Sequence, residues 1–124
     1  MALIEYLGAI TLQVDGVEME VQSLDVTSKT GRKLVKTMNS TGRAKGFCRG
    51  ISDFELKLTV VVPLSGDPDW ASIEGSKVTV YPQLLGGVTR SYQDCFTTEV
   101  GAKYTVDNEA VRDITMNSLR EVVE

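Results

Sequence analysis

Residues 51–62 alternate apolar and polar side chains, and this pattern limits the folds open to the chain more than any other feature. The apolar members are Phe54, Leu56, Leu58, Val60 and Val62, and the polar members are Asp53, Glu55, Lys57 and Thr59. Successive side chains of a β-strand point to opposite faces of the sheet. The pattern therefore predicts a strand with one buried and one exposed face, which is typical of antiparallel sheets.

A β-hairpin is predicted around Asp15-Gly16, which separates two runs of alternating apolar residues. Asp-Gly in this position favours a type I′ turn, because both central residues of that turn need a positive φ. After the turn the alternation changes phase between Val21 and Leu24, as it does where a β-bulge adds one residue to a strand. We therefore expect one long second strand over residues 17–27, kinked by the bulge.

A turn of sequence Ser-Gly-Asp-Pro ends the alternating strand, and a short helix is expected after it. Asp67 or Asp69 suits the N-cap of this helix, which would end at Gly75. Trp70 and Ile73 are three residues apart and would share one side of the helix. Trp70 is expected to anchor the core; the alternative is an interface anchor, because tryptophan is enriched at binding hot spots.

Four further strands are predicted in the second half of the chain, at residues 76–85, 88–98, 102–106 and 110–119. Turns at Gly86-Gly87 and Asp107-Asn108 separate them. Their expected inward-facing side chains are Val78, Val80, Val88, Tyr92, Phe96, Ile114 and Met116. The 124 residues fit a single domain, residues 1–124. The predicted fold is mainly β: an antiparallel β-sandwich or partly closed barrel with one short helix and a long extended loop.

The extended loop is predicted over residues 29–50, a glycine-rich segment called the basic arm here. It contains no acidic residue and seven basic residues, which are Lys29, Arg32, Lys33, Lys36, Arg43, Lys45 and Arg49. A structureless loop longer than ~12–15 residues is uncommon in a compact domain and is usually functional or disordered. The few apolar residues of the arm would allow an extended hairpin that becomes ordered on a partner.

The net charge of −4 conceals a strong asymmetry between the arm and the rest of the chain. Outside the arm, the remaining six of 13 basic residues stand against all 17 acidic residues, a balance of −11. Three interpretations stay open: a docking arm for acidic surfaces of neighbouring copies, a solvated loop, or a nucleic-acid-binding segment. Phe47 is the only aromatic residue of the arm, so the arm offers no platform for base stacking. We favour the docking arm.

The sequence offers no recognisable catalytic or metal site. The chain has no histidine, which excludes Ser-His-Asp and Cys-His arrangements and removes the commonest zinc ligand. Residues 40–46 resemble a phosphate-binding loop but lack its terminal Gly-Lys-Ser/Thr, and Asp67 and Asp69 lack the later ligands of a calcium loop. We therefore expect no enzyme, no cofactor and no metal.

Two cysteines, Cys48 and Cys95, are far apart in the sequence and are expected to be free thiols. A disulfide between them, or between neighbouring subunits, is the alternative. No apolar stretch reaches the ~18 residues of a membrane span, and the first residues lack the features of a secretory signal. We expect folding in a cytoplasm, without a membrane.

The order of these elements resembles the tail tube proteins of contractile-tailed, Mu-like bacteriophages. The likeness begins at residues 8–16, Gly-Ala-Ile-Thr-Leu-Gln-Val-Asp-Gly, and continues through the arm, the alternating strand and the helix that starts at Asp69-Trp70. A hairpin and a final strand complete it. The resemblance implies a structural subunit that closes into hexameric rings. These rings would stack into the hollow conduit for genome ejection inside a contractile sheath.

The resemblance also implies partners and roles for charged residues. The basic arm would reach the adjacent ring, and an acidic lumen would let DNA pass without specific binding. The candidate lumen residues are Glu18, Glu20, Asp53 and Glu55. The implied partners are further copies of the chain, the tail sheath protein, and baseplate and tail terminator proteins. The protein would reside in the virion after assembly in the host cytoplasm. Alternatives are another tube-fold component (a tube terminator, a baseplate hub or a secretion-system tube) or a nucleic-acid-binding β-barrel.

Overall fold

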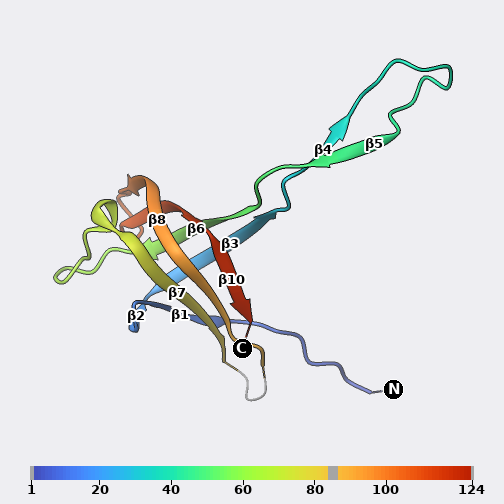
Figure 1. Cartoon of the computed structure of the whole chain (residues 1–124). Coiled ribbons are helices and arrows are strands. Elements are labelled where there is room, and N and C mark those ends of the chain that lie inside the picture. Colours follow the sequence, from blue (N-terminus) through green and yellow to red (C-terminus); the bar gives the residue numbers. More distant parts are fainter. Residues whose placement is uncertain (1, 84–86, 124) are drawn as a thin grey trace.

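The computed structural model describes residues 2–83 and 87–123, which fold almost entirely into β-strands (Figure 1). The strands are β1 (Ile10–Val14), β2 (Val17–Met19), β3 (Val21–Lys29), β4 (Arg32–Val35), β5 (Gly46–Arg49), β6 (Asp53–Val61), β7 (Glu74–Pro82), β8 (Arg90–Lys103), β9 (Val111–Ser118) and β10 (Arg120–Val123). The helical element of this part of the chain is a 3-10 turn, η1 (Trp70–Ser72). No helix in it is long and apolar enough to cross a membrane.

Eight strands form one antiparallel sheet that curls into a half-barrel. The sheet order is β2-β1-β7-β8-β9-β6-β3, and β10 pairs with the first part of β8. The edge strands β2 and β3 meet at Glu20, whose carbonyl accepts a hydrogen bond of 3.1 Å from the backbone N–H of Val61. Strands β4 and β5 pair with each other and project away from the half-barrel (Figure 1). The mainly β, partly closed barrel predicted from the sequence is thus confirmed.

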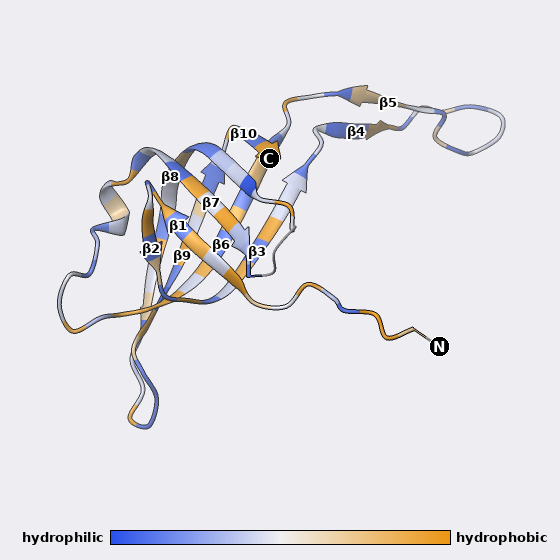
Figure 2. Ribbon diagram, turned by 90° about the horizontal axis from the view of Figure 1, so that it is seen from below, coloured by the Kyte–Doolittle hydropathy of each residue, from blue (hydrophilic) through white to orange (hydrophobic). Residues whose placement is uncertain are grey.

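Residues 53–61 of the alternating segment form β6, whereas Ile51 and Val62 at its ends lie outside the strand. The apolar side chains inside the strand face the core as predicted. Leu56, Leu58 and Val60 are buried, and β9 places Met116 opposite Leu56 and Ile114 opposite Leu58. Figure 2 shows hydrophobic residues alternating with hydrophilic ones along the strands of the curled sheet. Burial of this single apolar face supplies most of the driving force for folding. The other buried hydrophobic residues of the core are Leu12, Val14, Trp70, Val78, Tyr92 and Cys95.

The predicted hairpin at Asp15-Gly16 forms. Both residues have a positive φ, 53° and 82°, and Val14 pairs with Val17 across the turn. The Asp15 carboxylate also accepts a hydrogen bond from the backbone N–H of Lys77 at 2.9 Å. The turn is therefore fixed to the neighbouring strand β7.

The prediction of a single kinked strand over residues 17–27 is wrong in one respect. The chain leaves β2 at Glu20 and continues as β3, which pairs with β6 at the other edge of the sheet. The register shift lies between Val21 and Ser23, next to this break. The phase change in the sequence marks the bulge together with the crossing from one sheet edge to the other.

The predicted helix is reduced to η1. The Asp69 side chain makes no capping hydrogen bond. Asp67 does not cap η1 either, because its carboxylate pairs with Arg112 of β9 at 2.7 Å. Gly75 lies inside β7, at a register shift, and not at the end of a helix. Asp67, which would suit a helix cap, instead holds its loop against β9 through the ion pair with Arg112.

Strand β8 is longer than predicted, because it continues past residue 98 and takes in the first part of the short strand predicted at 102–106. The last predicted strand ends at Ser118, and β10 follows it as a separate strand against β8. The turn predicted at Gly86-Gly87 lies partly outside the described residues.

The inward-facing residues of the strand predicted at residues 88–98 also differ from the prediction. Tyr92 is buried as expected, but Val88 and Phe96 are exposed and Cys95 is buried instead. Asp94 has a positive φ of 56°, and the register shifts against both β7 and β9. A β-bulge interrupts the alternation of side chains between the two faces of the sheet. Tyr92 and Phe96, which are four residues apart, therefore do not face the same side.

Candidate assembly surfaces

The basic arm is a two-stranded hairpin that stands out from the half-barrel (Figure 1). Its strands pair antiparallel, with Arg32 opposite Arg49 and Val35 opposite Gly46. All residues of β4 and β5 are exposed, so the hairpin buries no core of its own. At its base the Gly50 N–H donates a hydrogen bond of 2.7 Å to the Gly31 carbonyl. An isolated two-stranded hairpin is marginally stable in water, and this one pairs with no other described strand.

The tip of the arm is an ordered turn around Asn39. The side-chain oxygen of Asn39 accepts a hydrogen bond from the Thr41 N–H at 3.0 Å, and its amide donates one to the Arg43 carbonyl at 2.8 Å. The Gly42 N–H donates a further bond of 3.2 Å to the Asn39 carbonyl. These bonds join the two sides of the loop beside Met38, whose side chain is fully exposed. The tip thus presents an apolar side chain on a preformed turn.

The basic residues of the arm differ in their surroundings. Lys29 lies on β3, where its Nζ is 3.1 Å from Glu55 Oε2, and the hydrogen bond to this carboxylate raises the pKa of Lys29. The same contact lowers the pKa of Glu55. Arg49 stacks on Phe47, with its guanidinium carbon 5.5 Å from the ring centroid. No ion pair to a carboxylate of residues 2–83 or 87–123 forms at Arg32, Lys33, Lys36, Arg43, Lys45 or Arg49.

The structure does not bring the four predicted lumen residues together. Glu18 and Glu20 are exposed at the corner where β2 passes to β3. Asp53 and Glu55 lie at the other end of the β3–β6 pair, where the arm begins. Lys29 pairs with Glu55 there, so that end carries mixed charge. The assignment of these residues to a lumen stays a prediction.

The two cysteines are free thiols in the structure. Cys95 is buried in the core, where its Sγ lies 3.1 Å from the Tyr92 carbonyl, and burial raises the pKa of the thiol. Cys48 is exposed on β5 of the arm. A bridge between them is therefore not formed, because one lies inside the half-barrel and the other on the projecting hairpin. A bridge between subunits stays a prediction.

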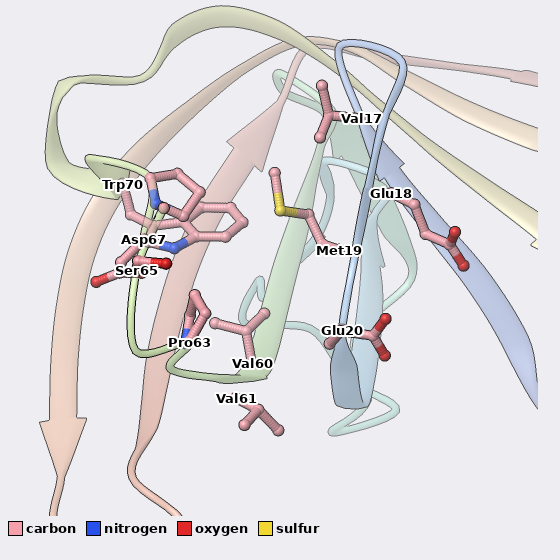
Figure 3. Close-up of a pocket in the computed structure, with 12 residues that line it drawn as sticks. Val17, Glu18, Met19, Glu20, Val60, Val61, Pro63, Ser65, Asp67 and Trp70 are labelled. Atoms are coloured by element: carbon pink, nitrogen blue, oxygen red, sulfur yellow. The ribbon is translucent and has the colours of Figure 1, made fainter.

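A pocket of about 440 Å³ lies at the end of β6 opposite to the arm (Figure 3). Strand β2, the end of β6 and the loop of residues 62–69 form its walls. Its apolar lining consists of Val17, Met19, Val60, Val61, Pro63, Pro68 and Trp70. In Figure 3, Val17 and Met19 point toward Trp70, whereas Glu18 and Glu20 point to the other side of β2. The sequence does not reveal this pocket, because its walls meet only when the sheet has curled.

Trp70 forms one wall of the pocket and belongs to the core. It is 2% exposed, and Ile73 packs partly buried against the same core, as expected of an anchor. The indole N–H of Trp70 is buried, and no described residue accepts a hydrogen bond from it. The ion pair between Asp67 and Arg112 fixes the adjoining loop to β9.

The N-terminal segment, residues 2–9, forms neither a strand nor a helix and extends away from the sheet (Figure 1). Four of its large apolar side chains are exposed: Leu3, Ile4, Tyr6 and Leu7. Exposed apolar segments of this kind are common where a partner covers them.

The fold is similar to solved structures of tube assemblies over nearly the whole chain. One is the sheath/tube terminator of PVC, an extracellular contractile injection system, with a TM-score of 0.69 and 17% identity over 98% of this chain and 99% of that chain. Another is the tube-terminating cap of the anti-feeding prophage, with a TM-score of 0.70 and 14% identity over 100% and 94%. The SPP1 tail tube gives a TM-score of 0.68 and 12% identity over 93% and 76%.

No family model and no curated protein matches the sequence. The likeness therefore rests on the path of the chain, which includes the curled sheet and spans almost the full length of the PVC and prophage chains. The protein has the tail-tube fold of phage-like tails and contractile injection systems.

Proposed function

We propose that this protein is a structural subunit of a phage tail tube. Its copies close into hexameric rings, and the rings stack into the hollow conduit for genome ejection inside a contractile sheath. The observation that carries the proposal is the basic hairpin arm projecting from one end of a half-barrel with the tail-tube fold. In this function the protein does no catalysis and needs no cofactor.

Free sheet edges support the formation of rings. β3 is the last strand of the sheet order, and on its outer side no described strand pairs with it. Most of its residues are exposed. A free edge of nine residues is a liability in a monomer, because it can pair with another chain. Between identical subunits of a ring the same edge becomes a contact, and the lumen wall can continue from copy to copy.

The polarity of charge supports the stacking of rings. The arm leaves the body at the Lys29–Asp53 end of the β3–β6 pair, and the exposed Glu18 and Glu20 lie at the opposite end. A contact between two different surfaces of identical subunits generates a filament when its rotation does not close. Opposite charges on the two surfaces favour the head-to-tail arrangement and disfavour its reverse.

A tube terminator is the second candidate. The similarity to the PVC sheath/tube terminator covers 98% of this chain, and the similarity to the prophage cap covers 100% of it. A terminator would stop the stack after one ring. A baseplate hub or a secretion-system tube on the same fold is a further alternative. In each case the partners would be other copies of the chain with sheath, baseplate or terminator proteins, in a virion or a related particle.

Electron microscopy of the purified protein tests the proposal. A tube subunit forms stacked rings or long hollow filaments as its concentration rises. Isolated rings that never stack would favour the terminator instead. A protein that stays monomeric at high concentration and binds single-stranded DNA with a steep salt dependence would be a nucleic-acid-binding barrel, and the tube proposal would be wrong.

A further inference from the structure

The arm and the apolar pocket lie at opposite ends of the same pair of strands. β3 and β6 place Lys29 opposite Asp53 at the arm end and Val21 opposite Val60 at the pocket end. Val60 and Val61 form part of the pocket wall. When copies stack head to tail, the arm of one copy therefore points toward the pocket end of the next.

The pocket has the character of a seat for an apolar side chain beside negative charge. Its wall between Met19 and Trp70 is apolar (Figure 3). The residues that line it include three acids, Glu18, Glu20 and Asp67, and no base. Asp67 is paired with Arg112, which leaves Glu18 and Glu20 exposed on the other side of β2.

The tip of the arm has the complementary character. Met38 is fully exposed at a turn that Asn39 holds in shape. Lys36 lies two residues before Met38, and Arg43 and Lys45 follow on the returning side of the hairpin. A preformed tip loses little conformational freedom on binding, and methionine adapts its shape to irregular apolar pockets.

We propose that Met38 of one copy inserts into the pocket lined by Met19 and Trp70 of the next copy. This inference rests on the proposed stacking and names the surface that receives the arm. The basic residues around Met38 then lie beside Glu18 and Glu20. The apolar N-terminal segment is the competing occupant, but residues 2–9 contain Glu5 and no basic side chain, so this segment lacks the charge complementarity of the arm tip.

Cross-linking of full-length variants tests the contact directly. Both partners carry Cys48→Ser. One carries Met38→Cys, and the other carries Val17→Cys at the pocket and a short tag, so that the mixed dimer is resolved on a denaturing gel. We expect a short bismaleimide to give the mixed dimer. The matched control replaces the pocket cysteine by Val106→Cys, which is fully exposed and is not among the residues that line the pocket.

The outcomes separate this inference from the proposed function. Stacked rings in the microscope with no more mixed dimer for Val17→Cys than for Val106→Cys would overturn the docking of Met38 and leave the tube proposal standing. A specific mixed dimer without rings or filaments would support the docking and overturn the tube. Neither rings nor a mixed dimer would overturn both.

A pair of substitutions at the tip gives a second, independent measurement. Met38→Asp places a charge in an apolar pocket and is expected to raise the protein concentration needed for stacking by about tenfold or more. Met38→Leu conserves the apolar volume and should change it by less than about threefold. Trp70 is the only tryptophan, so its emission should change on assembly of the wild type and Met38→Leu. Equal assembly of Met38→Asp and Met38→Leu would overturn the inference.

Discussion

At the scale of single residues, Gly31 leaves no room for a side chain at the base of the arm. Its φ is +78°, and a Cβ built on it would lie 2.7 Å from the Ile51 carbonyl oxygen. Gly31→Ala must therefore move the backbone at the base of the arm, where Gly50 donates its hydrogen bond. We expect faster hydrogen exchange of the Gly50 amide in this variant, measured by NMR.

Gly42→Ala is the matched control for Gly31→Ala. Its φ of +69° is also left-handed, but a Cβ there would meet nothing within 4 Å. The left-handed conformation costs both alanine variants ~1–2 kcal/mol, and only Gly31→Ala adds the clash. If the Gly50 amide of Gly31→Ala exchanges as slowly as in the wild type, the backbone at the base of the arm can move to accommodate the methyl group and still keep the hydrogen bond from Gly50 to residue 31.

Trp70 separates packing from hydrogen bonding in the core. Trp70→Ala opens a cavity and should lower the free energy of unfolding by about 3–5 kcal/mol. Trp70→Phe keeps most of the apolar contact and removes the indole N–H, for which no described residue is an acceptor. We expect a loss below about 1.5 kcal/mol, measured by urea denaturation. Equal losses for the two variants would contradict the importance of aromatic packing at this site.

The two thiols should differ sharply in reactivity. Cys95 is fully buried and its pKa is raised by burial, so little thiolate forms and a reagent cannot reach it. Cys48 is exposed on the arm. Titration of the unassembled protein with Ellman's reagent should show one fast thiol, and a second only after unfolding. Two fast thiols in the native protein would mean that the half-barrel opens around β8.

At the scale of elements, the arm should be separable from the body. β4 and β5 pair with each other and not with any other described strand. Replacing Lys33 to Lys45 by a short turn should leave the circular dichroism of the body and its midpoint of thermal unfolding nearly unchanged, because no core contact is lost. Stacking in the microscope should disappear. Loss of the fold would show that the arm is part of the core.

Strands with unbroken alternation could be predicted from the sequence. β6 and β9 keep a period of two across their buried residues, and Asp15-Gly16 favours its turn through the positive φ of both residues. β8 could not be predicted in full, because bulges reset its pattern at positions that depend on the neighbouring strands. The predicted helix is wrong for a related reason. Asp67 suits a helix cap by its local sequence, but its carboxylate pairs with Arg112, which is distant in the sequence.

The candidate surfaces could be predicted only where one segment makes them. The basic arm is a continuous run of sequence, and its separation from the body follows from its composition. The pocket joins β2, the end of β6 and Trp70, and periodicity carries no information on which ends of strands meet. Glu18 and Asp53 illustrate the same limit. Both lie on polar faces of predicted strands, but the fold places them at opposite ends of the β3–β6 pair.

At the scale of the whole molecule, the separation of charge should make stacking sensitive to salt. The arm carries six basic residues beyond Lys29, whereas the far end exposes Glu18 and Glu20. The Debye length falls from about 10 Å at 0.1 M salt to about 3 Å at 1 M, so attraction between the two ends is screened. We expect sodium chloride to raise the concentration needed for stacking, measured by sedimentation.

The salt response should stop short of complete dissociation if Met38 occupies the apolar pocket, because sodium chloride screens charge without removing the gain from burying apolar surface. Wild type should therefore keep a residual tendency to stack at 1 M salt, and Met38→Asp should lose it. The control is the unfolding of the monomer, whose ion pairs, such as Arg90 with Glu121, are partly exposed and contribute little. Its stability should change far less than stacking over the same range. Stacking that strengthens steadily with salt would contradict an electrostatic contact between the arm and the acidic end.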